Sequence, residues 1–241
     1  MEFTEKALIL RIGKFRESDL WVRLLSPSKG TITAFAFGGC ISRRRFCGCL
    51  DNLNLVLFRI KQHPVKKYYT LEEGTLVNAF IRLKKNSSRL GMAVNCLKFL
   101  QQIARAHIYA EEASGVYSLL LEALDVLENG DEIPSFFPLI FKARLIFAQG
   151  YEPCLDYCAL CGKGLRSIKD PYFSFTEGKI YCASCLKPAS QAIKTNFAAV
   201  HFLNKLQQAG PREWVKWNLS LQVRQNCARL VDAFGQYHLG V

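Results

Sequence analysis

Two cysteine motifs, Cys158-Ala-Leu-Cys161 and Cys182-Ala-Ser-Cys185, stand 20 residues apart in the second half of the chain. This spacing is typical of a zinc site with four thiolate ligands, because each C-x2-C motif presents two sulfurs from one tight turn. The segment between the motifs reads as a hairpin of two short strands around the turn Thr176-Glu-Gly178. The motifs therefore predict a zinc ribbon over residues 151–189, with Cys158, Cys161, Cys182 and Cys185 as the metal ligands.

Four thiolates close the coordination sphere of Zn²⁺, so we expect one structural ion per chain. A ribbon of this length has little core of its own, and metal binding then supplies folding free energy. A redox-active dithiol is the alternative interpretation of a C-x2-C motif. Cys154 precedes the first motif by four residues, and it is either a spectator or a competing ligand.

The first 80 residues indicate a small β-barrel. They contain five short runs of β-branched and aromatic residues, separated by turn residues. Ser26-Pro-Ser-Lys-Gly30 predicts the hairpin loop between the second and third runs. Five strands over residues 1–78 predict an OB-fold, although the count alone also fits an SH3-like barrel. The expected strands are 7–12, 20–25, 31–37, 53–60 and 68–71.

Beyond residue 78 the apolar residues recur at intervals of three and four residues, as expected for one face of an α-helix. Pro134 and Gly150 mark the expected start and end of the third helix. The apolar stripes are expected to face a core. We therefore predict an α+β multidomain protein, with a helical domain at 79–150 and 190–241 and the ribbon inserted in it. The expected helices lie around 90–103, 116–127, 133–149, 196–208 and 219–237.

The charge of the chain points to a polyanionic partner. With 32 Lys and Arg against 20 Asp and Glu, the formal net charge is +12. The excess is +6 in residues 1–80, +1 in 81–150 and +5 in 151–241. A chain with this charge is expected to bind nucleic acid. The alternative interpretation is that the positive charge only keeps the protein soluble.

Basic residues gather near the turns of the predicted barrel. Arg43, Arg44 and Arg45 follow two glycines after the third strand, and guanidinium groups suit phosphate contacts. Lys66-Lys67-Tyr68-Tyr69 combines positive charge with aromatic rings of the kind on which bases stack. The alternative is a solvated loop and a strand edge protected by lysine, with the nearby aromatic residues in the core. The candidate DNA contacts are Arg43, Arg44, Arg45, Lys14, Arg16, Lys29, Lys66 and Lys67.

Other classes of function find little support in the sequence. No phosphate-binding loop, dinucleotide fingerprint, nucleophile elbow or H-E-x-x-H motif occurs, and the four histidines are scattered. We therefore expect an ATP-independent protein that is not an enzyme. The apolar runs are too short to span a bilayer, and no secretory signal is evident, so we expect a cytoplasmic protein without a membrane partner. Cys40, Cys47 and Cys49 are read as free thiols, with a second metal site as the alternative.

Two blocks of sequence resemble the RecO family of bacterial recombination mediators. The first is Glu5-Lys-Ala-Leu-Ile-Leu-Arg-Ile-Gly-Lys-Phe-Arg-Glu-Ser-Asp-Leu20, followed by Leu24-Leu-Ser-Pro-Ser-Lys-Gly30, a strand, Gly38 and the arginine cluster. The second is Gly150-Tyr-Glu-Pro-Cys-Leu-Asp-Tyr-Cys158-Ala-Leu-Cys161-Gly162, which precedes the second cysteine motif. The resemblance covers nearly the whole chain in order. Cys154 and the cysteine-rich stretch 40–49 depart from the family pattern.

The resemblance implies an OB-fold, a helical domain and a four-cysteine zinc module in a protein that binds single- and double-stranded DNA without sequence preference. RecO-like proteins anneal complementary strands coated with single-strand-binding protein (SSB), and with RecR they help to load RecA. The acidic C-terminal tail of SSB contacts the helical domain in such proteins. The resemblance also assigns the four cysteines to zinc and Arg43–Arg45 to the basic loop, in a protein that works at the nucleoid.

Two other functions remain open at this point. A sequence-specific zinc-ribbon transcription factor would discriminate between duplexes by a factor of about 10³ or more, whereas a mediator would discriminate little. A zinc hydrolase would need an open coordination position and a nearby base, and four closely spaced cysteines argue against it.

Overall fold

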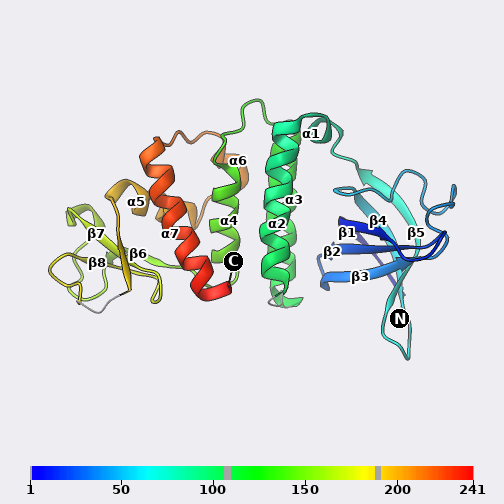
Figure 1. Cartoon of the computed structure of the whole chain (residues 1–241), viewed down its shortest axis with the longest axis horizontal. Helices are drawn as coiled ribbons and strands as arrows, with labels where there is room; N and C mark the ends of the chain where they lie inside the picture. The colour runs from blue at the N-terminus through cyan, green and yellow to red at the C-terminus, as the bar shows by residue number, and fades with distance from the viewer. Residues whose placement is uncertain (1, 106–109, 188–190, 241) are drawn as a thin grey trace. The chain divides into compact units, whose positions relative to one another are not determined.

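In a computed structural model, which describes residues 2–105, 110–187 and 191–240, the first five strands close into a barrel (Figure 1). The strand order is β1-β2-β3-β5-β4, with β4 pairing back onto β1. The β3–β5 pair is parallel and the other pairs are antiparallel. This is the predicted OB-fold barrel. Its strands are β1 (Glu2–Lys14), β2 (Leu20–Ser26), β3 (Gly30–Ala36), β4 (Leu55–Gln62) and β5 (Tyr69–Asn78).

Alternation of side chains along the strands separates the barrel core from its surface. On β2, Val22 and Leu24 are fully buried, while Trp21 and Arg23, which alternate with them, are partly exposed. The long loop between β3 and β4 also contributes to the core, through Phe46 and Cys49. The outer face of β2 and β3 therefore carries side chains that the barrel core does not need.

Two helices complete the barrel unit. The helix α3 (Ala110–Asn129) clusters with the barrel, and the Tyr117 hydroxyl donates to the Lys6 carbonyl at 2.8 Å. Burial, and to a lesser extent the charge of Glu5, raises the pKa of Tyr117 to about 12. The short helix α1 (Ile81–Lys85) is capped by the carboxylate of Glu128, which accepts the backbone N–H groups of Arg82 and Leu83.

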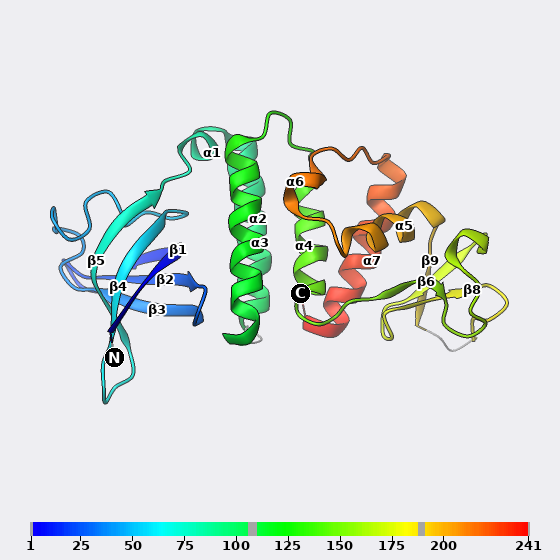
Figure 2. The same ribbon diagram turned by 180° about the vertical axis from the view of Figure 1, so that it is seen from behind.

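A second compact unit contains the remaining helices and the ribbon (Figure 2). The helix α4 is buried on nearly all sides, and its Phe137 ring meets Trp214 at 5.3 Å. Lys142 on the same helix is also buried, and its ammonium group pairs with Asp232 at 2.9 Å. The helices are α2 (Ser87–Arg105), α4 (Phe137–Phe147), α5 (Phe197–Leu206), α6 (Pro211–Trp214) and α7 (Leu221–Leu239).

The ribbon is a four-stranded sheet of order β6-β8-β7-β9, with a short 3₁₀ helix η1 (Leu165–Ser167). The predicted hairpin is confirmed as the antiparallel pair β7–β8. The sheet packs on the helices: β6 contacts α5, and Phe173 meets Phe234 of α7 at 5.6 Å. Its strands are β6 (Cys154–Cys158), β7 (Pro171–Ser174), β8 (Lys179–Cys182) and β9 (Ala192–Lys194).

The third predicted helix starts later than expected. Residues before α4 form a turn in which the Phe137 N–H donates to the Pro134 carbonyl at 2.9 Å, so the helix begins at Phe137. The helix also ends at Phe147, two residues before the predicted 149; Gly150, with a φ of 82°, lies in the turn that follows, where its N–H donates to the Phe147 carbonyl at 3.1 Å. No helix among the described residues is long and apolar enough to cross a membrane. The predicted boundaries of the barrel (1–78), the helical domain (79–150 and 190–241) and the ribbon (151–189) stay predictions.

Candidate nucleic-acid interface and metal centre

Three connections meet at one end of the barrel. The strand ends Lys14, Leu20, Ala36, Gln62 and Tyr69 are brought together there by the registers of their pairs. The β1–β2 turn is tied to the segment after β3, because the Gly38 N–H donates to the Asp19 carboxylate at 2.7 Å and the Cys40 N–H donates to the Ser18 carbonyl at 3.0 Å. The β4–β5 loop is closed by the bond from the His63 N–H to the Tyr68 carbonyl.

These connections enclose a cleft of about 380 Å³, which we call the barrel cleft. The Phe35 ring lies among three others: Phe15 at 4.9 Å, Phe37 at 6.1 Å and nearly parallel, and Tyr68 at 5.9 Å and edge-on. Phe15 and Phe37 are 48% and 40% exposed. The lining residues are Phe15, Arg16, Phe35, Phe37, Lys66 and Tyr68.

Positive charge borders the aromatic rings. The guanidinium of Arg16 lies 5.3 Å from the ring centre of Phe15. The mixed surface continues over the barrel wall, where Trp21 lies opposite Phe35 in the β2–β3 pair and the Arg11 guanidinium lies 5.7 Å from the Trp21 ring. Arg11 is paired in register with Arg23. Strands β1, β2 and β3 thus share an outer face of aromatic and cationic side chains, the face through which OB-folds bind oligonucleotides.

The predicted DNA contacts divide by position. Arg16 and Lys66 line the barrel cleft; Lys14 ends β1 and Lys67 lies in the β4–β5 loop, both at the same end of the barrel. Lys29 lies in the β2–β3 turn at the opposite end of that hairpin, since Ser26 pairs with Gly30 there and Leu20 pairs with Ala36 at the cleft end. Lys29 is therefore not brought to the cluster.

The three arginines of the β3–β4 loop differ in their contacts. The Arg45 guanidinium donates to the Phe37 carbonyl and lies 5.1 Å from the Phe46 ring, and its own carbonyl accepts the Gly74 N–H at 2.8 Å. Arg45 thus holds its loop against the barrel. All three arginine side chains are nevertheless exposed.

Sequence reasoning missed Arg11, Arg23, Phe35 and Phe37 as members of this surface. The signal was present in the alternation of β2 and β3, whose outward positions carry large aromatic and basic residues. What the alternation does not reveal is that β5 pairs with β3, which brings Tyr68 to Phe35.

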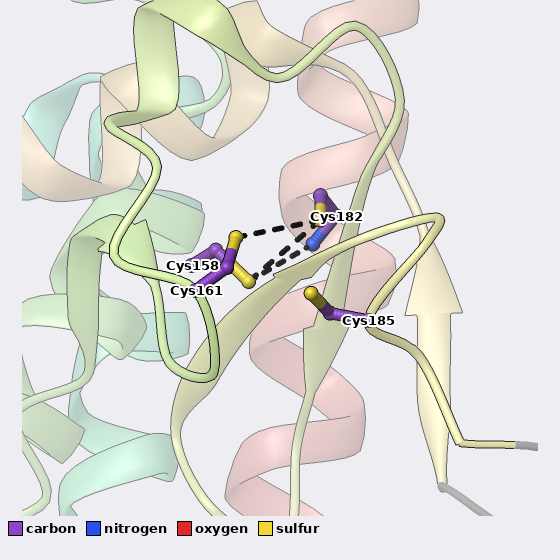
Figure 3. Close-up of side chains that lie close together, drawn as sticks. All are labelled: Cys158, Cys161, Cys182 and Cys185. Carbon is purple, nitrogen blue, oxygen red and sulfur yellow. Dashed lines mark hydrogen bonds between the residues drawn. The ribbon is translucent and has the colours of Figure 1, made fainter.

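The four predicted cysteines converge at one point of the ribbon (Figure 3). All four Sγ atoms lie within 4.8 Å of one another, with Cys158 and Cys161 at 3.9 and 3.8 Å from Cys182. A tetrahedral site with Zn–S bonds of about 2.3 Å requires sulfurs about 3.8 Å apart. The residues therefore fit a tetrahedral metal ion with four thiolate ligands.

Matching turns hold the two motifs. The Gly162 N–H donates to the Cys158 carbonyl at 2.9 Å, and the Leu186 N–H donates to the Cys182 carbonyl at 3.2 Å. Burial opposes ionisation of Cys158, but backbone N–H groups, Cys161 first, outweigh it and lower the pKa of this thiol. The Ser184 hydroxyl and then the Cys185 thiol lower the pKa of Cys182 to about 6. The hydrogen bond with Cys182 in turn raises the pKa of Cys185 to about 12. The thiolates stabilised in this cluster are thus those of Cys158 and Cys182, and thiolate is the form that binds metal.

The other cysteines stand apart from this centre. Among residues 2–105, 110–187 and 191–240, the group of side chains close enough to share a metal contains neither Cys154 nor Cys40, Cys47 and Cys49. The side chain of Cys154 interacts with Tyr157, whose pKa it raises. The Cys49 thiol is buried and donates to the Gly74 carbonyl at 3.1 Å.

Two family models match the chain in succession. Residues 1–80 match the model described as Recombination protein O N terminal, and residues 97–241 match Recombination protein O C terminal. The chain belongs to the RecO family of DNA repair proteins. The barrel with its cleft falls in the N-terminal RecO match, and the ribbon with its four cysteines falls in the C-terminal RecO match.

Relatives with curated names are similar to this chain over its full length. The DNA repair protein RecO of Oleidesulfovibrio alaskensis is 43% identical over 241 residues, which is 100% of this chain and 96% of the relative. That of Maridesulfovibrio salexigens is 40% identical over the same shares of the two chains. A more distant RecO, from Anaeromyxobacter sp., is 27% identical over 97% of this chain and 90% of the relative.

Proposed function

We propose that this RecO-family chain binds single- and double-stranded DNA without sequence preference and anneals complementary strands coated with SSB. The observation that carries the proposal is the end of the barrel, where Arg16 and Lys66 line an open cleft beside exposed aromatic rings. Lys14 and Lys67 add charge at the same end. Such a surface contacts phosphates and ring faces, which every nucleotide offers, and this favours binding without regard to sequence.

Annealing then follows from charge neutralisation. Two complementary strands repel through their phosphates, and cations at the barrel end and on the arginine loop reduce that repulsion when both strands are bound. Base pairing supplies the remaining free energy, so the protein needs no ATP and makes or breaks no covalent bond. We therefore propose a mediator and not an enzyme.

We propose zinc as the metal of the four-cysteine centre. A closed set of four thiolates is the usual structural zinc site, and the sulfur separations agree with it. Zinc held by the four cysteines would join the turn after β6 to the turn after β8, and its role would be structural.

The acidic tail of SSB is proposed to bind the helical unit. A pocket of about 440 Å³ there is lined by apolar residues of α5 and α7, including Phe197 and Val223. Lys205 and Lys216 lie in its wall, and the Lys205 ammonium is 5.3 Å from the Trp217 ring centre. Such a pocket suits a peptide with an apolar side chain and flanking carboxylates. We propose RecR, and through it RecA at the nucleoid, as further partners because the chain belongs to the RecO family.

The decisive experiment is annealing of complementary oligonucleotides precoated with the cognate SSB, without ATP, followed by fluorescence quenching. Faster pairing than with SSB alone is expected. If the chain accelerates neither coated nor naked strands and instead prefers one duplex sequence by about 10³ or more, the proposal is wrong and a sequence-specific zinc-ribbon factor takes its place.

A further inference from the structure

The β3–β4 loop carries two cysteines on one tight turn. The Cys49 N–H donates to the Phe46 carbonyl at 3.1 Å, and Gly48 has a φ of 65°. A positive φ at the third residue is characteristic of a type II turn, where glycine is favoured. The turn therefore holds Cys47 and Cys49 in a C-x-C motif, two residues apart, a spacing that a disulfide can span.

The two thiols differ in their access to solvent. Cys47 is exposed, whereas Cys49 is 1% exposed and packs in the barrel core. The Cys49 sulfur lies 3.4 Å from the Cys47 carbonyl oxygen, so the two residues are in direct contact. Burial, and after it the charge of Cys47, raises the pKa of Cys49. A small oxidant can thus reach Cys47, while Cys49 next to it stays protonated and shielded.

The backbone of this turn is fixed by a buried side chain. The Asn54 amide nitrogen donates to the Gly48 carbonyl at 3.2 Å and to the Cys49 carbonyl at 2.9 Å. The amide oxygen of Asn54 accepts the Lys84 ammonium at 2.7 Å. The turn is therefore preorganised, and the two cysteines stay neighbours when their side chains react.

Cys49 also ties the loop to β5. Its thiol donates to the Gly74 carbonyl at 3.1 Å, and the Gly74 N–H donates to the Arg45 carbonyl at 2.8 Å. A disulfide has no S–H group, so oxidation of Cys49 removes the first of these two hydrogen bonds. The state of this thiol thus affects how firmly the loop is held.

We propose that a hydroperoxide, such as hydrogen peroxide, joins Cys47 and Cys49 in a reversible disulfide that loosens the β3–β4 loop. The Cys47 thiolate attacks one peroxide oxygen, the O–O bond breaks, and hydroxide leaves a sulfenic acid behind. The Cys49 sulfur then attacks the Cys47 sulfur, so that an S–S bond forms and a second hydroxide leaves. The two thiol protons convert both hydroxides to water. The cysteines are oxidised, the peroxide is reduced, and an external dithiol reverses the reaction.

The loosened loop also carries Arg43 and Arg44, and the effect on DNA rests on the proposed function. Both guanidinium groups are presented to phosphates by this loop. Its loosening is expected to weaken DNA binding by about tenfold, which corresponds to the loss of roughly one charge-assisted hydrogen bond.

Peptide mass spectrometry of the full, zinc-loaded chain after hydrogen peroxide treatment tests the disulfide. Trypsin cuts after lysine and arginine, which places Cys47 and Cys49 together in the peptide 46–59. Cys40 falls in a different peptide, 30–43. We expect the peptide 46–59 to lose two hydrogen atoms and to regain them with dithiothreitol.

Melting temperature and DNA affinity report the loosened loop. The oxidised chain should melt at a lower temperature than the reduced chain and bind DNA about tenfold more weakly. Cys47→Ser should show neither difference, because peroxide can then act only on other thiols. Cys40→Ser is the matched control, since Cys40 is another exposed thiol of the same loop, and this variant should respond as the unaltered chain does.

A peptide 46–59 that gains oxygen without losing hydrogen, or a bond between Cys40 and Cys47, would overturn the proposal. A disulfide that leaves the melting temperature and the DNA affinity unchanged would overturn it as well. A reduced chain that binds no DNA would instead refute the proposed function, while the mass and melting results would still decide the modification site.

Discussion

Arg43, Arg44 and Arg45 carry the same guanidinium group but differ in their contacts. The Arg45 guanidinium is engaged with the Phe37 carbonyl and the Phe46 ring, so it stabilises the loop that closes the barrel. All three arginines are exposed on the β3–β4 loop. A run of three arginines in a sequence therefore contains two candidate phosphate contacts and one residue that positions them.

Substitution of these residues separates the two roles. We expect Arg43→Ala/Arg44→Ala to weaken DNA binding and to flatten the salt slope by roughly one unit for each phosphate that is no longer neutralised, with an unchanged melting temperature. Arg45→Ala should instead lower the melting temperature of the barrel. Unchanged affinity and slope in the Arg43→Ala/Arg44→Ala variant would place the phosphate-binding residues elsewhere.

The buried Lys142 of the helical unit allows a test of how much its ion pair with Asp232 contributes to stability. Its ammonium group reaches Asp232 and also lies 5.2 Å from the Phe99 ring, while its own side chain is only 9% exposed. Asp232 is 64% exposed, so loss of the pair leaves a hydrated carboxylate. We expect Lys142→Met to keep or raise the melting temperature, because the buried stem is retained and no charge stays buried. Lys142→Ala should lower it, by leaving a cavity beside α7.

At the scale of elements, the ribbon does not depend on metal alone. Its sheet rests on the helices, with Leu155, Phe173 and Ile180 buried and Phe173 against Phe234. The cysteine turns lie after β6 and β8, and backbone hydrogen bonds fix their positions. The metal is therefore expected to order the turns, while apolar burial holds the strands.

Metal removal tests this division. We expect a chelator, or Cys158→Ser, to release one zinc per chain and to lower the melting temperature of the helical unit. Amide exchange should speed up around 158–163 and 182–186 and stay slow in α7. DNA affinity at the barrel should persist, since the barrel has its own core. A complete loss of helical signal on chelation would show that metal binding is required for the whole unit to fold.

Most helices and strands could be predicted from the local sequence pattern, and those that could not are missed for physical reasons. The alternation at 20–25 and the stripe at 219–237 predict β2 and α7 because burial acts on neighbouring positions. The helices α1 and α6 are five and four residues long, too short for a period to appear. The four cysteines are predictable because both motifs are local, whereas the barrel cleft needs the pairing of β3 with β5, which no short segment encodes.

At the scale of the molecule, the barrel cleft and the pocket between α5 and α7 belong to different units. We expect Lys205→Glu/Lys216→Glu to weaken binding of an acidic SSB-tail peptide by about tenfold or more, through charge repulsion, with unchanged affinity for naked DNA. Peptide binding by calorimetry and annealing of coated strands are the measurements. Equal loss of naked-strand annealing would show that the pocket serves DNA.

Trp21 spreads its indole across the backbone of Gly13 on the adjacent strand, where even a single methyl group would collide with the ring. A larger residue at position 13 therefore requires the Trp21 ring to move aside or to be replaced by a smaller one. We expect the two positions to change together among relatives.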